Sequence, residues 1–166
     1  MNQAQGAIDA ARAAGADRLA EAEFAAAVDA LTRSNQAAAD RDYRLALGLA
    51  IDSRERAQNA AKVAVEARAD LRGEAERAIA EASTLLQRAL SQLDSPDMSR
   101  VNPRSLRPPR ATVAAAQKAL QEARSALGRE DYAGVTTALG DTSSQLQAAL
   151  GLIDTAVSSA QPRRNR

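Results

Sequence analysis

The chain contains neither cysteine nor histidine among its 166 residues, and aromatic residues make up only 2% of it. Without these residues, disulfide bonds and thiolate sites are excluded, and a nucleophile would lack an imidazole base. A metal could be held only by carboxylates, and none of them follows the spacing of a calcium loop. No phosphate-binding glycine motif is present either. We therefore expect no catalytic, cofactor-binding or metal-binding residues, and a protein that is not an enzyme.

Long apolar runs are also missing. No stretch of about 18 apolar residues occurs, so the sequence contains no candidate for a membrane-spanning helix. Proline and glycine are scarce, with five and eight copies, whereas alanine is the commonest residue, with 42. Because alanine is the best helix former, this composition is typical of an all-α protein.

Residues 43–93 contain no proline and only two glycines, Gly48 and Gly73. Small apolar residues recur along this stretch every three or four positions, which predicts one continuous helix of about 50 residues. Four further helices are predicted by the same periodicity, at residues 4–14, 19–38, 113–128 and 132–159. We therefore predict an all-α fold, an elongated antiparallel bundle of about five helices around the long central helix.

Helix-capping residues mark the starts of three predicted helices. Asp42 and Asp131 precede the helices that begin at Tyr43 and Tyr132, and Thr112 precedes the helix at 113–128. Four of the five prolines fall in residues 94–111, which are therefore predicted to form a long loop. A connection of this length is uncommon in a compact protein and is usually either functional or mobile.

The sequence also contains an internal repeat. At a constant offset of 89, residues 24–27 (FAAA) align with 113–116 (VAAA), and Asp42-Tyr43 aligns with Asp131-Tyr132. A weaker match at an offset of 71 aligns Ala7-Ile8 with Ala78-Ile79. Such self-similarity favours two three-helix units that share the long helix. The predicted units are residues 1–72 and 73–160, followed by a basic tail at 161–166. Alternatively, alanine-rich helices resemble one another through composition alone.

The two tyrosines occupy equivalent places at the starts of helices. We predict that the rings of Tyr43 and Tyr132 pack into the core at the end of each hairpin and leave their hydroxyl groups in water. Alternatively, Asp42, Tyr43, Asp131 and Tyr132 form a paired binding surface.

Charge is unevenly distributed. Residues 1–97 carry 12 basic and 16 acidic side chains, whereas residues 98–166 carry 10 and 5. In an up-and-down bundle the loop and the tail meet at one end, which would bring seven arginines together. These are Arg100, Arg104, Arg107, Arg110, Arg163, Arg164 and Arg166. They predict a binding site for an anionic lipid, another polyanion or an acidic protein, unless the loop is merely solvated. The mildly acidic body and the lack of aromatics for stacking disfavour nucleic acid.

Several dipeptides and single residues form a further pattern, which consists of Ala7-Ile8, Gly15-Ala16, Ala30-Leu31, Asp42-Tyr43, Ala46 and Leu49-Ala50. Together these residues resemble a bacterial domain of unknown function that occurs in cell-envelope lipoproteins. The resemblance covers about residues 4–95. It implies a secreted protein, periplasmic or associated with the outer membrane, whose lipid-anchoring cysteine would lie upstream of Met1. It implies no catalytic residues.

The resemblance favours a non-enzymatic scaffold of the bacterial cell envelope that binds proteins or other envelope components. The Asp-Tyr hairpin pattern also resembles a tetratricopeptide hairpin. The alternative function is accordingly that of a cytoplasmic adaptor, and a third possibility is a binder of anionic lipid or polyanion.

Overall fold

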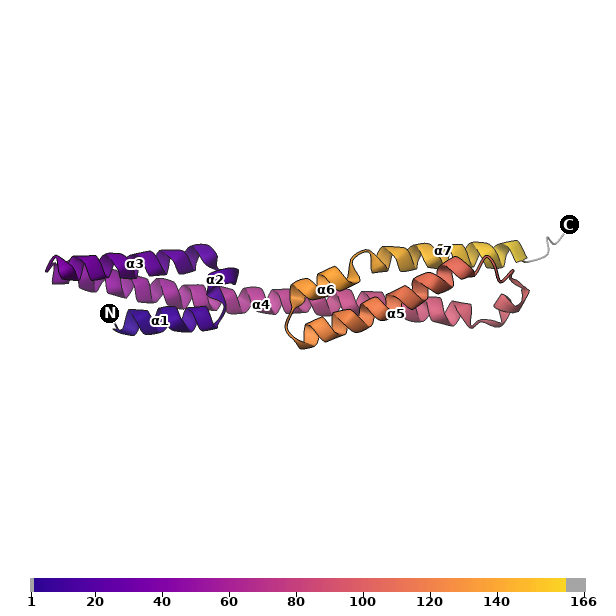
Figure 1. Cartoon of the computed structure of the whole chain (residues 1–166), viewed down its shortest axis with the longest axis horizontal. Helices are drawn as coiled ribbons and strands as arrows, with labels where there is room; N and C mark the ends of the chain where they lie inside the picture. The colour runs from indigo at the N-terminus through magenta and orange to yellow at the C-terminus, as the bar shows by residue number, and fades with distance from the viewer. Residues whose placement is uncertain (1, 161–166) are drawn as a thin grey trace. The chain divides into compact units, whose positions relative to one another are not determined.

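The computed structural model describes residues 2–160, and every regular element in this range is a helix (Figure 1). The elements are α1 (Asn2–Ala13), α2 (Ala16–Leu19), α3 (Glu21–Ala39), α4 (Tyr43–Leu93), the 3₁₀ helix η1 (Pro96–Arg100), α5 (Arg107–Gly128), α6 (Tyr132–Leu139) and α7 (Thr142–Ala160). The predicted all-α fold is confirmed. No helix within residues 2–160 is both long enough and apolar enough to cross a membrane.

Helix α4 has the predicted bounds, Tyr43 to Leu93, and its 51 residues run through Gly73 without a break. Its first turn is capped by Asp42, whose Oδ1 accepts a hydrogen bond of 3.0 Å from the N–H of Leu45. The helix continues because no proline interrupts it and because alanine dominates its buried positions.

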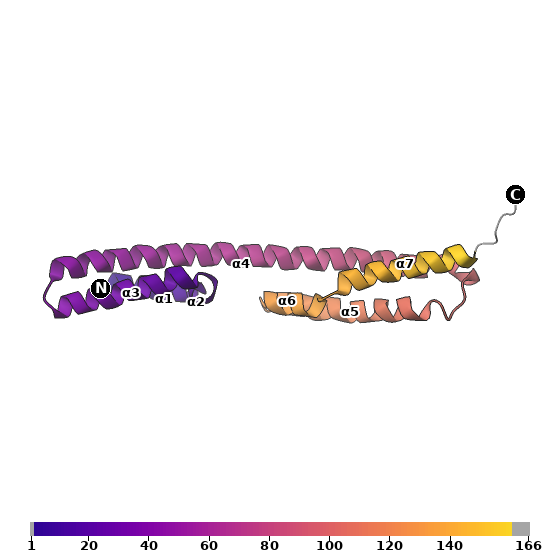
Figure 2. The same cartoon turned by 90° about the horizontal axis from the view of Figure 1, so that it is seen from above.

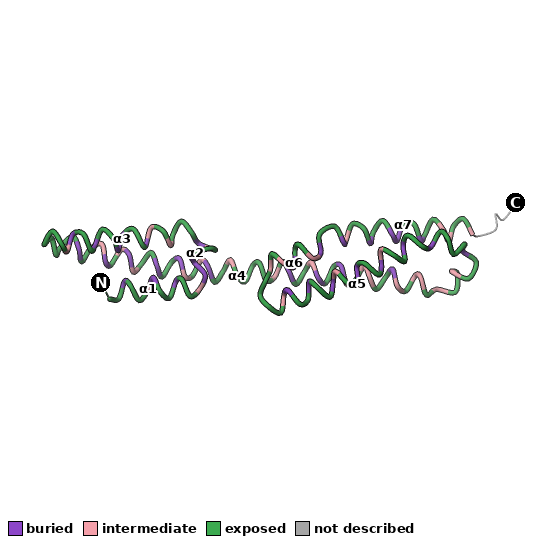
Figure 3. Tube along the Cα trace, in the orientation of Figure 1, coloured by how far each residue is buried: buried purple, intermediate pink, exposed green. Residues whose placement is uncertain are grey.

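The chain forms two compact units that divide between Leu71 and Arg72. The first unit contains α1, α2, α3 and the part of α4 that ends at Leu71. The second contains the remainder of α4 together with η1, α5, α6 and α7. Figure 2 shows the helices of each unit lying along that unit's part of α4. Each unit buries a stripe on the facing sides of its helices, drawn purple in Figure 3.

The core of the first unit consists mainly of alanine, and two buried serines join its helices. Ser34 Oγ on α3 donates to the carbonyl oxygen of Ala46 on α4, and Ser53 Oγ on α4 donates to that of Ala27 on α3, each over 2.8 Å. A short hydroxyl side chain can reach the neighbouring backbone only where two helices lie close together. The small side chains therefore allow close packing, and the hydroxyl groups are satisfied.

The repeat is visible in the pattern of burial. At the offset of 89, six buried positions of α4 in the first unit correspond to six buried positions of α6 and α7. They are Ala46, Ala50, Ser53, Ala57, Ala60 and Ala64, and Val135, Leu139, Thr142, Leu146, Ala149 and Ile153. At the offset of 71, Ala4, Ile8 and Ala11 of α1 correspond to Ala75, Ile79 and Ala82 of α4. The two units therefore share one packing scheme, but the second fills it with larger side chains.

The two helical hairpins are also equivalent at the level of hydrogen bonds. In the first, Asp42 N–H donates to the carbonyl of Ala37 and Arg41 N–H to that of Ala38. In the second, 89 residues later, Asp131 N–H donates to the carbonyl of Ala126, and Glu130 N–H to that of Leu127. Arg41 and Glu130 have φ values of 67° and 59°. Both turns are thus Schellman motifs with a left-handed residue that is not glycine.

Three predicted helix boundaries are wrong. The helix predicted at 19–38 corresponds to α3, which begins at Glu21 after a break at Ala20, whereas Leu19 is the last residue of α2. The helix predicted at 132–159 is interrupted at Gly140 and forms α6 and α7. Gly140 has φ 41° and ψ −122°, a conformation that only glycine adopts without strain. Helix α5 begins at Arg107 rather than after Thr112, because prolines at positions 108 and 109 are tolerated in a first turn that needs no N–H donors.

Removal of either aspartate cap tests the equivalence of the hairpins. We expect Asp42→Ala and Asp131→Ala each to lower the free energy of unfolding by about 1 kcal/mol, because a helix N–H loses its acceptor. Asp→Asn at the same positions should change it little, because asparagine caps equally well. Urea denaturation followed by circular dichroism measures the difference, and an alanine variant as stable as the wild type would contradict the assigned caps.

Candidate functional site

The proline-rich segment at residues 94–111, which we name the arginine loop, includes η1 and the first residues of α5. It is held against the second unit by apolar side chains. Val101, Leu106 and Pro109 are all buried. Burying such residues ties the segment to the helices beneath it. The arginine loop is thus an anchored part of the fold, although the sequence left open whether it is merely solvated.

Local hydrogen bonds fix the backbone of the arginine loop. Ser95 caps η1, and Pro96 occupies its first position, as expected for a short turn. Further on, Asn102 Oδ1 accepts a bond of 2.9 Å from the N–H of Arg104, and its carbonyl accepts one of 2.7 Å from Ser105 Oγ. This turn is stabilised by its own side chains, as is typical of asparagine in turns.

The four arginines of this segment, Arg100, Arg104, Arg107 and Arg110, are exposed. Within residues 2–160 none of their side chains forms an ion pair or donates a hydrogen bond. Most basic side chains elsewhere in this range have a partner. The arginine loop therefore presents four guanidinium groups whose charge the fold does not neutralise.

Two arginines of α4 illustrate the contrast. Arg56 Nε lies 2.8 Å from Asp52 Oδ2, and Arg72 Nε lies 2.8 Å from Glu76 Oε1, both at the i, i+4 spacing that pairs side chains on one helix face. The hydrogen bond and then the charge of the carboxylate raise the pKa of the Arg56 guanidinium, and Glu76 raises the pKa of Arg72 in the same way.

The beginning of α5 supplies no backbone donors of its own. Pro108 and Pro109 have no N–H, Arg107 N–H donates to the carbonyl of Arg104, and Arg110 N–H donates to that of Leu106. A helix start usually binds anions through free N–H groups. An anion at the arginine loop would therefore be bound by guanidinium groups.

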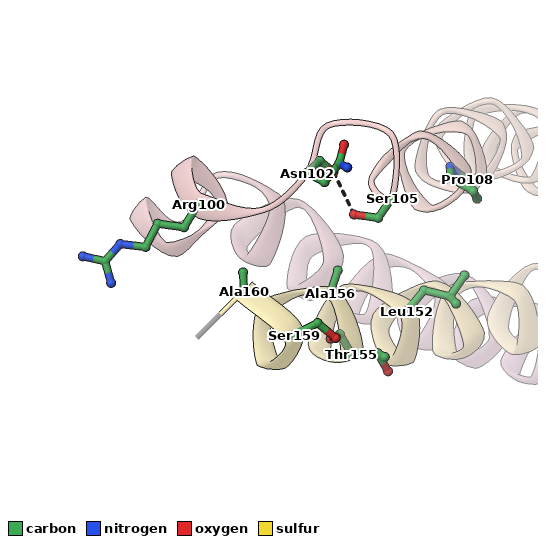
Figure 4. A pocket seen from close by; sticks show the side chains of 9 residues that line it. All are labelled: Arg100, Asn102, Ser105, Pro108, Leu152, Thr155, Ala156, Ser159 and Ala160. Atoms are coloured by element: carbon green, nitrogen blue, oxygen red, sulfur yellow. Dashed lines mark hydrogen bonds between the residues drawn. The ribbon is translucent and has the colours of Figure 1, made fainter. Parts of the chain in front are cut away.

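A groove of about 530 Å³ separates the arginine loop from α7 (Figure 4). Its loop side is formed by Arg100, Asn102, Ser105 and Pro108. Its α7 side is formed by Leu152, Thr155, Ala156, Ser159 and Ala160. A second hollow, of about 380 Å³, adjoins α7 and is lined in part by Asp97 and Asp154. Acidic side chains thus line the second hollow, whereas none lines the groove.

The sequence did not predict this groove. Of the nine residues that line it, only Arg100 was a candidate site residue. The available signal was Leu152, which lies outside the buried stripe of α7 and is 51% exposed. A large apolar residue off the buried stripe of a helix indicates a second apolar face.

The predicted packing of the two tyrosines is correct only for Tyr132. This ring packs against the core cluster of the second unit, which includes Ala75 and Ile79 of α4. Tyr43 is 69% exposed, so the prediction that it packs into the core is wrong. At the offset of 71, the segment of α4 that packs beside Tyr132 corresponds to α1. The start of α1 lines a small hollow with Leu47, Ala50, Ile51 and Arg54. Here Gln3 Oε1 accepts a bond of 3.3 Å from Arg54 Nη1.

Tyr43 belongs to a narrow exposed row on α4, with Leu47 and Ile51 at successive i+4 positions. A hollow of about 70 Å³, lined in part by Leu47 and Ile51, adjoins this row. The repeat places Thr136 and Gly140 at the positions equivalent to Leu47 and Ile51, so the row is apolar only in the first unit. The caps Asp42 and Asp131 are equivalent, whereas Tyr43 and Tyr132 differ in burial.

The remaining candidate residues, Arg163, Arg164 and Arg166, lie outside the described residues. Within residues 2–160 no three carboxylates are grouped so that they could hold a metal ion. Comparison of the chain with protein-family models, curated proteins and solved structures found no match in any of the three. The resemblance to a cell-envelope domain therefore remains a prediction from the sequence.

Proposed function

We propose that the protein is a non-enzymatic helical scaffold that binds partners bearing phosphate or carboxylate groups through the arginine loop. The observation that carries this proposal is the anchored loop, in which buried Val101, Leu106 and Pro109 position four exposed, unpaired arginines. A guanidinium group binds such anions through two parallel hydrogen bonds. Because the loop is already ordered, binding requires little further loss of conformational entropy.

The net charge of this region supports an anionic partner. From residue 98 to residue 121 the chain contains four arginines and Lys118 but no acidic residue. Unneutralised charge of one sign raises the local concentration of oppositely charged ligands. Salt screens such exposed charges over about 10 Å at 0.1 M, so binding should weaken as ionic strength rises.

The location proposed for this scaffold is the bacterial cell envelope, and the support for it is the resemblance stated from the sequence. Fractionation of cells that express the full natural gene measures it directly. Recovery with the periplasm or the outer membrane would support the proposal, whereas recovery in the cytosol would favour the alternative of an adaptor.

Replacement of the four loop arginines tests the binding function. With inorganic polyphosphate as the probe, we expect the quadruple change of Arg100, Arg104, Arg107 and Arg110 to Ala to weaken binding roughly 30- to 1,000-fold at low salt. This range follows if each exposed arginine–phosphate contact contributes about 0.5–1 kcal/mol to the free energy of binding. Isothermal titration calorimetry measures the affinities.

The matched control removes the same charge elsewhere. Arg18, Arg33, Arg44 and Arg88 are also exposed, but they lie outside the arginine loop. Their joint replacement by Ala should weaken polyphosphate binding far less. If the two quadruple variants lost equal affinity for polyphosphate, binding would depend on net charge alone, and the proposed site would then be abandoned.

A further inference from the structure

We propose that the groove between the arginine loop and α7 holds the acyl chain of an anionic lipid, whose headgroup lies at its Arg100 end. This inference rests on the proposed function and names the class of ligand. The volume of about 530 Å³ is within the range of small-molecule sites, roughly 300–1,000 Å³. The groove is preformed, because the buried anchors Val101 and Leu106 hold the loop in place.

An apolar row lines the floor of the groove. Leu152, Ala156 and Ala160 lie at successive i+4 positions on α7 and extend over about 12 Å. Pro108 lies on the opposite wall. This row is separate from the core stripe of α7, in which Leu146 and Ile153 are buried. Helix α7 therefore has a second apolar face that is open to a ligand.

The hydroxyl groups along the groove favour a hydrocarbon over a polar ligand. Thr155 Oγ1 donates to the carbonyl of Gly151, and Ser159 Oγ donates to that of Thr155, each over 2.8 Å. Ser105 Oγ donates to the carbonyl of Asn102 over 2.7 Å. Each hydroxyl has one proton, and each is already used. An acyl chain can therefore contact these three side chains without leaving a hydroxyl donor unsatisfied.

The charges around the groove select an anionic headgroup. Arg100 lies at the end of the groove next to Ala160, and its guanidinium group points outward, away from α7 (Figure 4). No acidic residue lines the groove, and Asp154 of α7 lines the second hollow, where its Oδ1 accepts a bond from Gln92 Nε2. A lipid with its chain over Leu152 and Ala156 would thus place its phosphate near Arg100.

The proposal predicts a preference among ligands, which can be measured with single-chain lipids below their critical micelle concentration. Lauroyl lysophosphatidylglycerol should bind to the 166-residue protein at least tenfold more tightly than glycerol 3-phosphate, which lacks the acyl chain. It should also bind more tightly than lauroyl lysophosphatidylcholine, whose headgroup has no net charge. The proposal is overturned if either comparison shows equal binding.

Variants of the groove locate the site. Leu152→Gln and Ala156→Gln combined should weaken lysophosphatidylglycerol binding at least tenfold and leave polyphosphate binding unchanged. Leu47→Gln is the matched control, because Leu47 is an exposed leucine outside the groove, on α4 of the first unit. Circular dichroism checks that each variant folds. Unchanged lipid binding in the groove variant would overturn the lipid proposal alone, whereas polyphosphate binding that does not depend on the loop arginines would overturn the proposed function.

Discussion

Leu146→Ala is expected to lower the free energy of unfolding of the second unit by about 2–5 kcal/mol. Leu146 is fully buried on α7. It belongs to a core cluster with Ala89, Val113, Ala116 and Leu150. The cluster joins α4, α5 and α7, so the three helices cannot all close over the space left by the removed atoms. Amide hydrogen exchange, resolved by residue, measures the loss in each unit separately.

Two controls test whether buried volume is the cause. Leu152→Ala makes the same chemical change on the same helix at an exposed position and should alter stability by no more than about 0.5 kcal/mol. Ala57→Leu inserts a leucine at the position of the first unit that the repeat aligns with Leu146. Because Ala57 is fully buried in a cluster that consists mainly of alanine, overpacking should cost about 1–3 kcal/mol. A stabilising Ala57→Leu would contradict the close packing assigned to the first unit.

The features that the sequence predicted correctly depend on local signals. The bounds of α4 follow from Asp42 at its start, from the absence of proline and from the spacing of its alanines. The equivalence of the hairpins follows from Asp-Tyr pairs 89 residues apart, each preceded by a helix. Such signals act within one or two turns of the residue that carries them, so no tertiary information is needed to interpret them.

The features that were missed depend on contacts between distant segments. Two prolines in succession can end a helix or begin one. At Pro108-Pro109 the structure shows a beginning, and burial of Leu106 and Pro109 against the second unit accompanies it. Similarly, the sequence identified the four arginines as a charged run. It could not predict the groove, which exists only because the arginine loop lies beside α7.

The repeat itself explains one wrong prediction. Because Tyr43 and Tyr132 are aligned, they were expected to pack alike. Burial is conserved at the positions that face helices present in both units, such as Ala46 and Val135. The two tyrosines, in contrast, differ in burial. In the second unit, α4 supplies the core residues beside Tyr132. In the first unit α1 takes the place of that segment, and its hydrogen bond to α4 is made at Arg54, further along the helix than Tyr43. Sequence repeats therefore predict shared helix pairs more securely than shared surfaces.

Gly73→Pro is expected to destabilise the protein by about 3 kcal/mol or more, because Gly73 lies in the interior of α4. Proline would remove the N–H that bonds to the carbonyl of Ala69, and its ring would clash with that carbonyl. It would also push Arg72 out of the helical conformation and so disturb the 2.8 Å pair with Glu76. Helix content by circular dichroism and the free energy of unfolding in urea measure the effect.

Gly73→Ala separates the backbone effect from any effect of side-chain volume. A Cβ at this position would meet nothing within 4 Å, so alanine adds no clash. It should stabilise the helix by about 0.5–1 kcal/mol, because alanine loses less conformational entropy than glycine on folding. Gly73→Pro should lower the free energy of unfolding and Gly73→Ala should raise it, and this opposition is expected only if α4 is continuous through this position. If proline were tolerated as well as alanine, α4 would be two helices in solution, because a helix end accepts proline and a helix interior does not.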